Sequence, residues 1–238
     1  MIYSHRRDIG SDKQAVERYE GREISFMTTR TQELLRDVQE KVCFIPCTTR
    51  SVAQYRRLQL LPDWQPQFAL VANGGILLEH GNVDEAWYQE SLQLAEKAAE
   101  QLRLAAMLLE KAESRILPVK WIDSLFLFTK SDEPRQLQRQ LRAQLDLMQV
   151  EVLLHGQKLY VLPRELHKGT AVQRLRCRYP KDHVIAAGDS AFDVPMLLAA
   201  DYAFAPESLA EPLQAQQQKQ LIPDKQLVSE TVLQALCQ

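Results

Sequence analysis

The chain has 238 residues, a formal net charge of −2 and a sequence pI near 6.2. Hydrophobic residues make up 45% and charged residues 25%, which is ordinary for a globular protein and argues against disorder. The 29 basic and 31 acidic residues create no overall field for nucleic acid or an anionic membrane, and the 8 glycines form neither GxGxxG nor GxxxxGK[ST], the two common nucleotide-binding loops.

Targeting and redox signals indicate a cytoplasmic protein. No stretch reaches the ~18 consecutive apolar residues of a membrane span, and the start, MIYSHRRDIGSDK, lacks the apolar core of a signal peptide. The 4 cysteines form no CxxC, so we expect reduced thiols, with Cys43 and Cys47 as small core residues. We therefore expect neither a membrane nor a nucleic-acid partner.

The first part of the chain predicts alternating strands and helices. Residues 15–28 predict a hairpin about Glu20-Gly21, and 30–40 predict a helix. The apolar run VCFIPCT, 42–48, predicts a strand buried on both faces, followed by a helix near 51–59 and a strand at 68–73. This order implies a parallel sheet with right-handed crossovers.

The middle of the chain predicts a different order of strands and helices. Local strand pairs alternate there with helices: a strand at 76–80, one long helix at 84–113, two strands at 119–130 about Asp123-Ser124, a helix at 133–147 and a hairpin at 150–163 about Gly156-Gln157. Strands that pair locally suggest a small α+β unit.

The C-terminal part of the chain again predicts alternating helices and strands, as the first part does. It predicts a helix at 168–178, a strand at 183–188, a helix from about 192, a strand at 202–205 and a helix near 225–236, while the Gln-biased stretch 214–220 predicts a solvated helix or loop. The sequence therefore predicts an α/β fold with a Rossmann-like parallel-sheet core, residues 1–76 and 164–238, interrupted by an α+β insert, residues 77–163.

The strongest chemical signal is GDSAFD, Gly188 to Asp193, where a predicted strand ends and a helix begins. Ligands of open α/β sheets bind beyond the carboxyl ends of strands, so Asp189 is expected to face that crevice, with Asp193 turned toward the same point. Two carboxylates without a basic neighbour in sequence suit Mg²⁺. The alternative is a helix N-cap with a carboxylate favoured by the helix dipole.

A second signal is the helix start HKGT, residues 167–170. A cation at a helix N-terminus does not help the helix, so Lys168 suggests an anion held by its ammonium and by the free N–H groups of the first turn. The alternative is an ordinary surface lysine whose stem lies along the protein.

A third signal is CTTRS, 47–51, at the end of the strand predicted for 42–48. A hydroxyl and backbone N–H groups at such an end are typical phosphate donors, so Thr48 is a candidate for a phosphoryl oxygen, and Arg50 can add a charge-assisted bond. The alternative is an N-cap threonine for the next helix.

A fourth signal is ANGG, 72–75, where the insert begins. Asn73 tolerates the left-handed region, and Gly74 and Gly75 suit a hinge. A plain turn explains these residues equally well.

Together, in this order and placement, the four signals resemble the haloacid dehalogenase superfamily. More narrowly, they resemble its phosphatases with a large cap inserted after the third core strand, such as the Cof-type, sucrose-phosphatase and mannosylglycerate-phosphatase proteins. The resemblance covers nearly the whole chain and implies Mg²⁺-dependent hydrolysis of a small phosphorylated metabolite, with the cap choosing the substrate.

The resemblance also implies roles for single residues. Thr48 corresponds to the hydroxyl of the second motif, Lys168 to the cation of the third, and Asp189 to the metal ligand of the fourth. Asp193 corresponds to a further ligand or to a partner behind the ligands. Arg50, Asn73 and Gly74 would lie at the substrate.

The first motif of the superfamily, DxDx[TV] after a buried strand, is not found in the 238 residues. Its first Asp forms the aspartyl-phosphate. Asp8 and Asp12 have the wrong spacing and follow no apolar strand, so neither takes that role. The missing strand would lie between those ending at Thr48 and Gly188, so we expect a start site assigned too late or a truncated chain, inactive as written.

Two function classes remain open. The first is the Mg²⁺-dependent phosphatase acting through an aspartyl-phosphate. The second is a catalytically dead protein of the same fold that binds phosphate or a protein partner. A phosphotransferase on this fold is not distinguished from a phosphatase by sequence.

Overall fold

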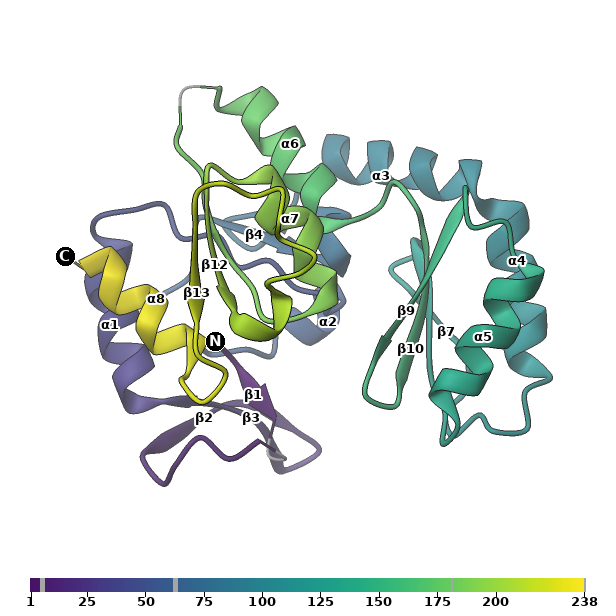
Figure 1. Cartoon of the computed structure of the whole chain (residues 1–238), viewed down its shortest axis with the longest axis horizontal. Helices are drawn as coiled ribbons and strands as arrows, with labels where there is room; N and C mark the ends of the chain where they lie inside the picture. Colours follow the sequence, from purple (N-terminus) through teal and green to yellow (C-terminus); the bar gives the residue numbers. More distant parts are fainter. Residues whose placement is uncertain (5–6, 62–63, 181, 238) are drawn as a thin grey trace.

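A computed structural model describes residues 1–4, 7–61, 64–180 and 182–237. The chain forms two lobes joined side by side (Figure 1). The core lobe contains both chain ends, and the other lobe is made by the middle of the sequence. This mixed α/β arrangement confirms the predicted fold class. The borders of the insert, 77 and 163, stay a prediction.

One sheet of the core lobe is parallel. The strands β11 (Ile185–Ala187), β12 (Tyr202–Pro206) and β13 (Lys219–Ile222) pair in that order. Helices α6 (Lys168–Arg178) and α7 (Val194–Ala199) contact each other beside it. The prediction of a solvated helix or loop at 214–220 is wrong in its last two residues, because Lys219 and Gln220 pair with β12. The many Gln residues of 214–220 do not show the apolar pattern of a strand, so the sequence did not predict the start of β13.

A second, separate sheet of the core lobe contains β4 (Phe68–Val71), β5 (Ile76–Glu79) and β6 (Asn82–Val83), which are antiparallel. The strand predicted for 42–48 is not regular: it is an extended segment with one parallel bridge, Cys47 to Leu70. The segment forms backbone hydrogen bonds with Leu70 of β4 through the carbonyl of Pro46 and the N–H of Thr48. Pro46 has no N–H group with which to extend the pairing. Cys43 is exposed, which corrects its expected place in the core.

A separate small sheet lies below the core lobe in Figure 1. It contains β1 (Tyr3–Ser4), β3 (Arg22–Thr28) and β2 (Lys13–Tyr19), and the predicted hairpin turn at Glu20-Gly21 is confirmed with φ of 50° and 73°. A bulge interrupts β2 at Glu17. We call β2 and β3 the flap hairpin. Helix α1 (Thr29–Gln39) follows and packs against α8 (Val228–Cys237).

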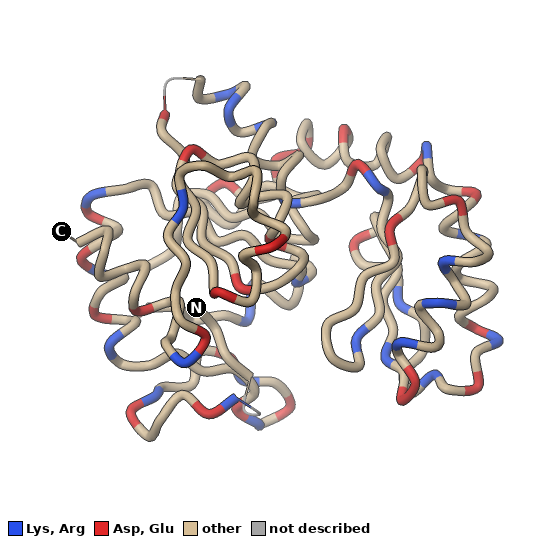
Figure 2. Tube along the Cα trace, viewed as in Figure 1, with Lys and Arg blue, Asp and Glu red and all other residues tan. Residues whose placement is uncertain are grey.

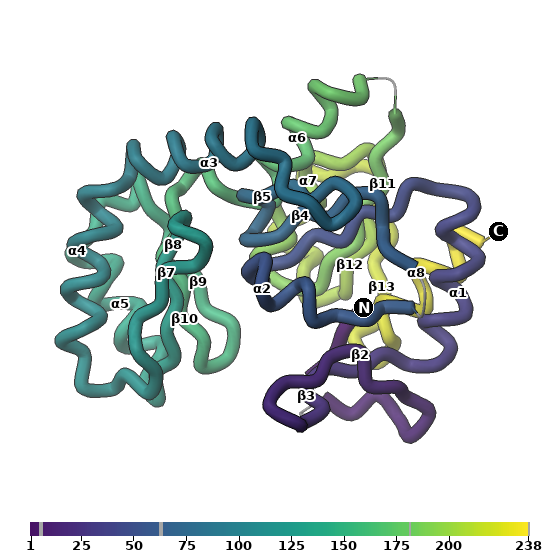
Figure 3. The backbone as a smooth tube through the Cα atoms, turned by 180° about the vertical axis from the view of Figure 1, so that it is seen from behind, coloured from purple at the N-terminus to yellow at the C-terminus, as the bar shows by residue number. Residues whose placement is uncertain are grey.

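Two predicted helices change length. Helix α2 (Val52–Tyr55) is shorter than expected, because the chain leaves it to form an antiparallel bridge between Leu58 and Glu17. The helix predicted for 84–113 is two helices, α3 (Glu85–Lys97) and α4 (Ala99–Glu110), broken at Ala98. The two follow different surfaces, since Trp87 of α3 packs in the core lobe and Leu102 of α4 packs in the insert. Seen from behind, α3 leads from β4 and β5 across to the insert (Figure 3).

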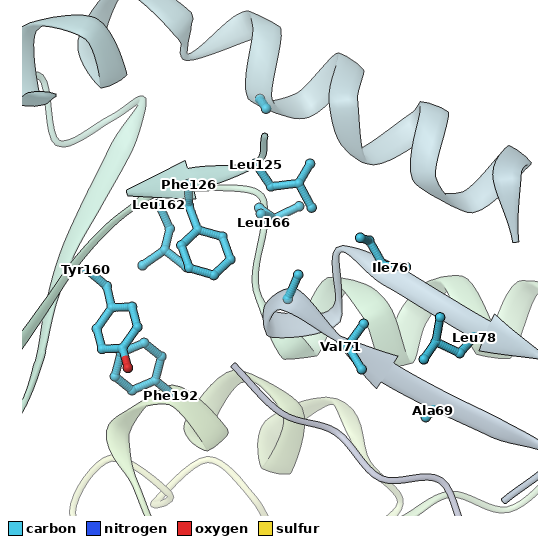
Figure 4. Close-up of a cluster of buried hydrophobic side chains, with 12 residues drawn as sticks. Ala69, Val71, Ile76, Leu78, Leu125, Phe126, Tyr160, Leu162, Leu166 and Phe192 are labelled. Atoms are coloured by element: carbon cyan, nitrogen blue, oxygen red, sulfur yellow. The ribbon is translucent and has the colours of Figure 1, made fainter. Parts of the chain in front are cut away.

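The insert is an antiparallel sheet with helices on one face. Strands β7 (Lys120–Ile122), β8 (Phe126–Lys130), β10 (Lys158–Pro163) and β9 (Val150–His155) lie in that order. Helices α4 and α5 (Pro134–Gln144) cover one face through a cluster that includes Leu127 and Val161. The residues that alternate with these, such as Phe126 and Tyr160, turn to the other face and join a cluster with Val71 and Phe192 of the core lobe (Figure 4).

The insert is therefore packed onto the core lobe directly above the GDSAFD loop. In Figure 4, Tyr160 and Phe192 point toward each other, and their ring centroids are 5.0 Å apart at an edge-to-face angle of 74°. Basic and acidic residues are interspersed along both lobes (Figure 2). None of the helices in the described ranges combines the length and the apolar character that a membrane crossing needs.

Candidate active site

The Thr48 loop and the Asn73 turn are joined into one backbone unit. The N–H of Asn73 donates to the carbonyl of Thr48 over 2.9 Å, and the N–H of Ala72 donates to the carbonyl of Arg50 over 2.7 Å. The Thr48 hydroxyl accepts the N–H of Arg50 at 3.2 Å, while Ser51 caps α2, so Thr48 is not the helix cap. Its hydroxyl proton stays available as a donor.

The Asn73 turn also holds the next motif. Asn73 adopts the left-handed region with φ of 60° and is buried, and its side-chain amide donates to the carbonyl of Leu166 over 3.1 Å. Gly74, with φ of 89°, lies so close to α6 that a Cβ there would meet the Ala171 Cβ at 2.6 Å. The turn thus fixes the start of α6, and with it Lys168.

Lys168 is a buried residue, which excludes the interpretation as a surface lysine. Its side chain is 7% exposed, and its Nζ donates to Asp193 Oδ1 over 2.5 Å and to the carbonyl of Cys47 over 3.1 Å. Burial lowers the pKa of Lys168, but the carboxylate of Asp193 outweighs it and leaves this pKa raised. The ammonium is charged at neutral pH and lies beside the residue that precedes Thr48.

Asp193 is surrounded by donors of the protein. Its Oδ2 accepts the backbone N–H groups of Asp189 and Ser190 at 3.1 and 3.0 Å and the Ser190 hydroxyl at 2.7 Å. Burial raises its pKa, but the Lys168 ammonium and the Ser190 hydroxyl outweigh this, so the pKa of Asp193 is lowered. Gly188 makes the arrangement possible, because a Cβ there would lie 2.2 Å from the Asp193 Cβ.

Asp189 is the open carboxylate of the pair. Its side chain is 45% exposed, and its ion pair is with Arg7 at 3.6 Å. The described residues contain no group of three or more His, Cys, Asp or Glu side chains arranged for a metal ion. Mg²⁺ needs no such group, since it takes one or two carboxylates and fills its other positions with water and phosphate oxygens. The donor set of Asp189, with Asp193 behind it, fits that ion.

The search of protein-family models adds the deciding observation. Residues 74–221 match the model of the haloacid dehalogenase-like hydrolases, which is more than half of the chain. The chain belongs to the haloacid dehalogenase-like hydrolase family. Its match includes Lys168, Asp189 and Asp193, and it begins at Gly74 of the Asn73 turn. No curated protein is similar in sequence.

Solved structures share the fold of this hydrolase at low sequence identity. The sucrose-phosphatase of Synechocystis sp. PCC6803 superposes with a TM-score of 0.65 and 18% identity over 86% of this chain and 90% of that one. A phosphatase of the HAD superfamily from Bacteroides thetaiotaomicron gives 0.56 and 16% over 93% and 90%. The trehalose-6-phosphate phosphatase of Aspergillus fumigatus gives 0.52 and 13% over 94% and 88%.

Within this haloacid dehalogenase-like fold, the predicted residues separate into two groups. Thr48, Asn73, Lys168 and the two aspartates share one network of hydrogen bonds and charges, described above. Arg50 differs, because its backbone belongs to the network while its guanidinium extends to the flap hairpin. Its contact with a phosphoryl oxygen stays a prediction.

Three residues that contact the elements around the predicted site were not singled out from the sequence: Glu17, Asp123 and Tyr160. Asp123 in the β7–β8 turn accepts the backbone N–H of Val52 at 3.0 Å, which joins the insert to α2. The φ of 44° at Asp123 agrees with the turn that the sequence predicts at Asp123-Ser124, but no sequence pattern indicated the contact with Val52. Asp8 and Asp12, which sequence analysis excluded as nucleophiles, are engaged with Gly10 and Thr29 at exposed turns.

Proposed function

We propose that the protein is a Mg²⁺-dependent phosphatase that hydrolyses the phosphomonoester of a small metabolite in the cytoplasm. One observation carries the proposal: the buried, charged Lys168 binds the carbonyl of the residue before Thr48 and the carboxylate of Asp193, which in turn accepts the N–H of the half-exposed Asp189. Together they offer a cation, a neutral donor and a metal ligand, which are the groups that stabilise a transferring phosphoryl group. The solved relatives named as phosphatases share this fold.

The metal role falls to Asp189, whose side chain is 45% exposed and forms a longer ion pair, 3.6 Å, with the exposed Arg7. Asp193 acts behind it, because its oxygens already bind Lys168, Ser190 and the Asp189 N–H group. When bound, Mg²⁺ would supply a Lewis acid for the phosphate oxygens. Lys168 and Thr48 would bind the other phosphoryl oxygens, with Arg50, Asn73 and Gly74 at the substrate. The insert would act as the cap that excludes water and selects the leaving group.

The aspartyl-phosphate route needs a nucleophilic carboxylate, and the 238 residues contain no DxDx[TV] motif to supply it. This observation keeps the second candidate, a phosphate-binding protein of the same fold without catalysis. With these residues alone, we expect phosphate binding and little or no turnover. The third possibility, phosphotransfer to an acceptor other than water, is separated by product analysis.

The test is hydrolysis of p-nitrophenyl phosphate by the longest open reading frame that contains these residues. The phosphatase requires turnover that EDTA removes and Mg²⁺ restores, and that Asp189→Ala abolishes. Asp37→Ala, an exposed position on α1, serves as the matched control. Equal turnover in Asp189→Ala refutes the metal role. No turnover, together with phosphate binding that Lys168→Met removes, favours the binding protein.

A further inference from the structure

Glu17 of the flap hairpin is a buried carboxylate, although it lies in a strand that is largely exposed. Its side chain is 0% exposed, and it lies at the bulge that interrupts β2. Oε2 accepts the Ser25 hydroxyl and Arg50 NH1, both at 2.7 Å, and Oε1 accepts Arg57 Nε and NH2 at 3.2 and 3.0 Å. One hidden carboxylate therefore binds two arginines.

These contacts keep Glu17 ionised. Burial raises its pKa, but the Ser25 hydroxyl and the Arg50 guanidinium outweigh this, so the pKa of Glu17 lies below its ordinary value. One negative charge faces two positive charges, which leaves the cluster with an excess of one positive charge. The excess favours an anion nearby.

The two arginines differ in where they lie. Arg57 leads away from the site and covers the Tyr19 ring at 4.5 Å. Arg50 is part of the Thr48 loop, where its N–H binds the Thr48 hydroxyl and its carbonyl binds Ala72. Burial raises the pKa of Tyr160 in the insert, and a hydrogen bond with Thr49 and the charges of Arg50 and Lys168 oppose that rise.

Within the part of the chain that the structure describes, the Arg50 guanidinium uses two of its donors in side-chain hydrogen bonds. A guanidinium has five N–H donors, and its hydrogen bonds to described side chains use one on Glu17 and one on Ser25. The side chain is 25% exposed. Because two hydrogen bonds hold the planar Arg50 guanidinium, it has little freedom to rotate. Its remaining N–H groups are therefore already oriented for a further oxygen that binds there.

We propose that Glu17 is a positioning residue of the phosphate site, which holds the Arg50 guanidinium so that its unused N–H groups bind a phosphoryl oxygen. The proposal rests on the proposed function, because it assumes that phosphate binds at the Thr48 loop. Glu17 itself touches no substrate. It makes the flap hairpin part of the site by way of Arg50.

The experiment measures the Kd of inorganic phosphate, with Mg²⁺ present, by isothermal titration calorimetry on the whole chain. Glu17→Gln and Arg50→Lys are each expected to raise Kd about tenfold or more, the effect of one charge-assisted bond. The double variant is expected to bind no more weakly than either single variant, since both remove the same contact. Glu17→Asp keeps the charge, but its shorter side chain moves the carboxylate oxygens away from Arg50, so it is also expected to raise the Kd of phosphate.

Two controls separate positioning from stability. Arg57→Lys alters the other side of Glu17, and it is expected to lower the melting temperature while Kd stays within about twofold of wild type. Glu23→Gln, at an exposed ion pair of the same hairpin, is expected to change neither. If Glu17→Gln does not fold, Ser25→Ala removes one bond to Arg50 and is expected to raise Kd about threefold.

Wild-type Kd in folded Glu17→Gln and Glu17→Asp overturns the inference, provided that Lys168→Met abolishes binding. When the Glu17 variants do not fold, an unchanged Kd in Ser25→Ala overturns it equally. A wild-type chain that binds no phosphate refutes the proposed function instead, and the inference falls with it. Phosphate binding by the wild-type chain distinguishes the two failures.

Discussion

The buried ion pair between Lys168 and Asp193 is the feature on which the site depends most. Its side chains are 7% and 8% exposed, and the two atoms are 2.5 Å apart. Replacing Lys168 by Met leaves a buried carboxylate without its cation, and replacing Asp193 by Asn leaves a buried ammonium. Each single change is expected to cost about 3–5 kcal/mol of the free energy of unfolding, because an unpaired charge is left in the core.

The pair also predicts how stability depends on pH. The pKa of Asp193 is lowered in the folded state, so its contribution is present above the unfolded value near ~4 and is lost as pH falls below it. The pKa of Lys168 is raised, so its contribution is present below about 10.4 and is lost as pH rises through its folded value. Asp193→Asn is expected to flatten the acid side of this profile.

Urea denaturation at pH 7 measures these costs, with a double-mutant cycle to isolate the pair. The double variant Lys168→Met/Asp193→Asn leaves no unpaired charge, so it is expected to cost less than either single variant. The matched control is the exposed pair Arg18–Glu23, 2.8 Å long, whose loss is expected to cost about 0.2–1 kcal/mol. Single costs at the level of this control, or full additivity in the cycle, would show that the reasoning is wrong.

Two further changes test the loops around the pair. Gly188→Ala is expected to lower the free energy of unfolding by about 1–3 kcal/mol in urea denaturation, because its Cβ would lie 2.2 Å from the Asp193 Cβ. Gly156→Ala, with φ of 60° and no atom within 4 Å, is expected to lower it by about 1 kcal/mol. A larger loss in Gly156→Ala than in Gly188→Ala contradicts the packing argument. Burial raises the pKa of Asp123, so its ionisation lowers stability as pH rises from about 4. Asp123→Asn keeps an acceptor for the Val52 N–H group, and its melting temperature at pH 7 is expected to equal or exceed that of wild type, whereas Asp123→Ala should lose about 1 kcal/mol; equal effects of the two substitutions refute the role of this acceptor.

Local chemistry explains why the motif positions were predictable from sequence. The helix at 168–178 begins and ends as predicted, because the His167 side chain accepts the Thr170 N–H group and caps it. The GDSAFD loop likewise contains its own capping box between Ser190 and Asp193. Each motif is built from neighbours within a few residues, which a sequence pattern can reveal.

The features that sequence analysis missed depend on distant partners. Glu17 alternates like an exposed strand residue, and its burial comes from Arg50 and Arg57, which lie 33 and 40 positions away. The break at Ala98 carries no Gly or Pro signal, because it arises from two helices following different surfaces. The exposure of Cys43 depends in the same way on which strands pair beside it, and an apolar run alone cannot specify that.

If phosphate binds at the proposed site, the two buried carboxylates explain how the cations of that site are fixed before it binds. Asp193 and Glu17 each lie behind a cation, Lys168 or Arg50, and each fixes that cation by at least one short bond. Free cations of equal charge would lose conformational freedom when phosphate bound, and that loss would weaken binding. Cations that are already fixed lose little, and they act from a region where water screens them weakly. The burial of negative charge near the proposed phosphate site is therefore consistent with its chemistry, because each of the two carboxylates orients a cationic donor.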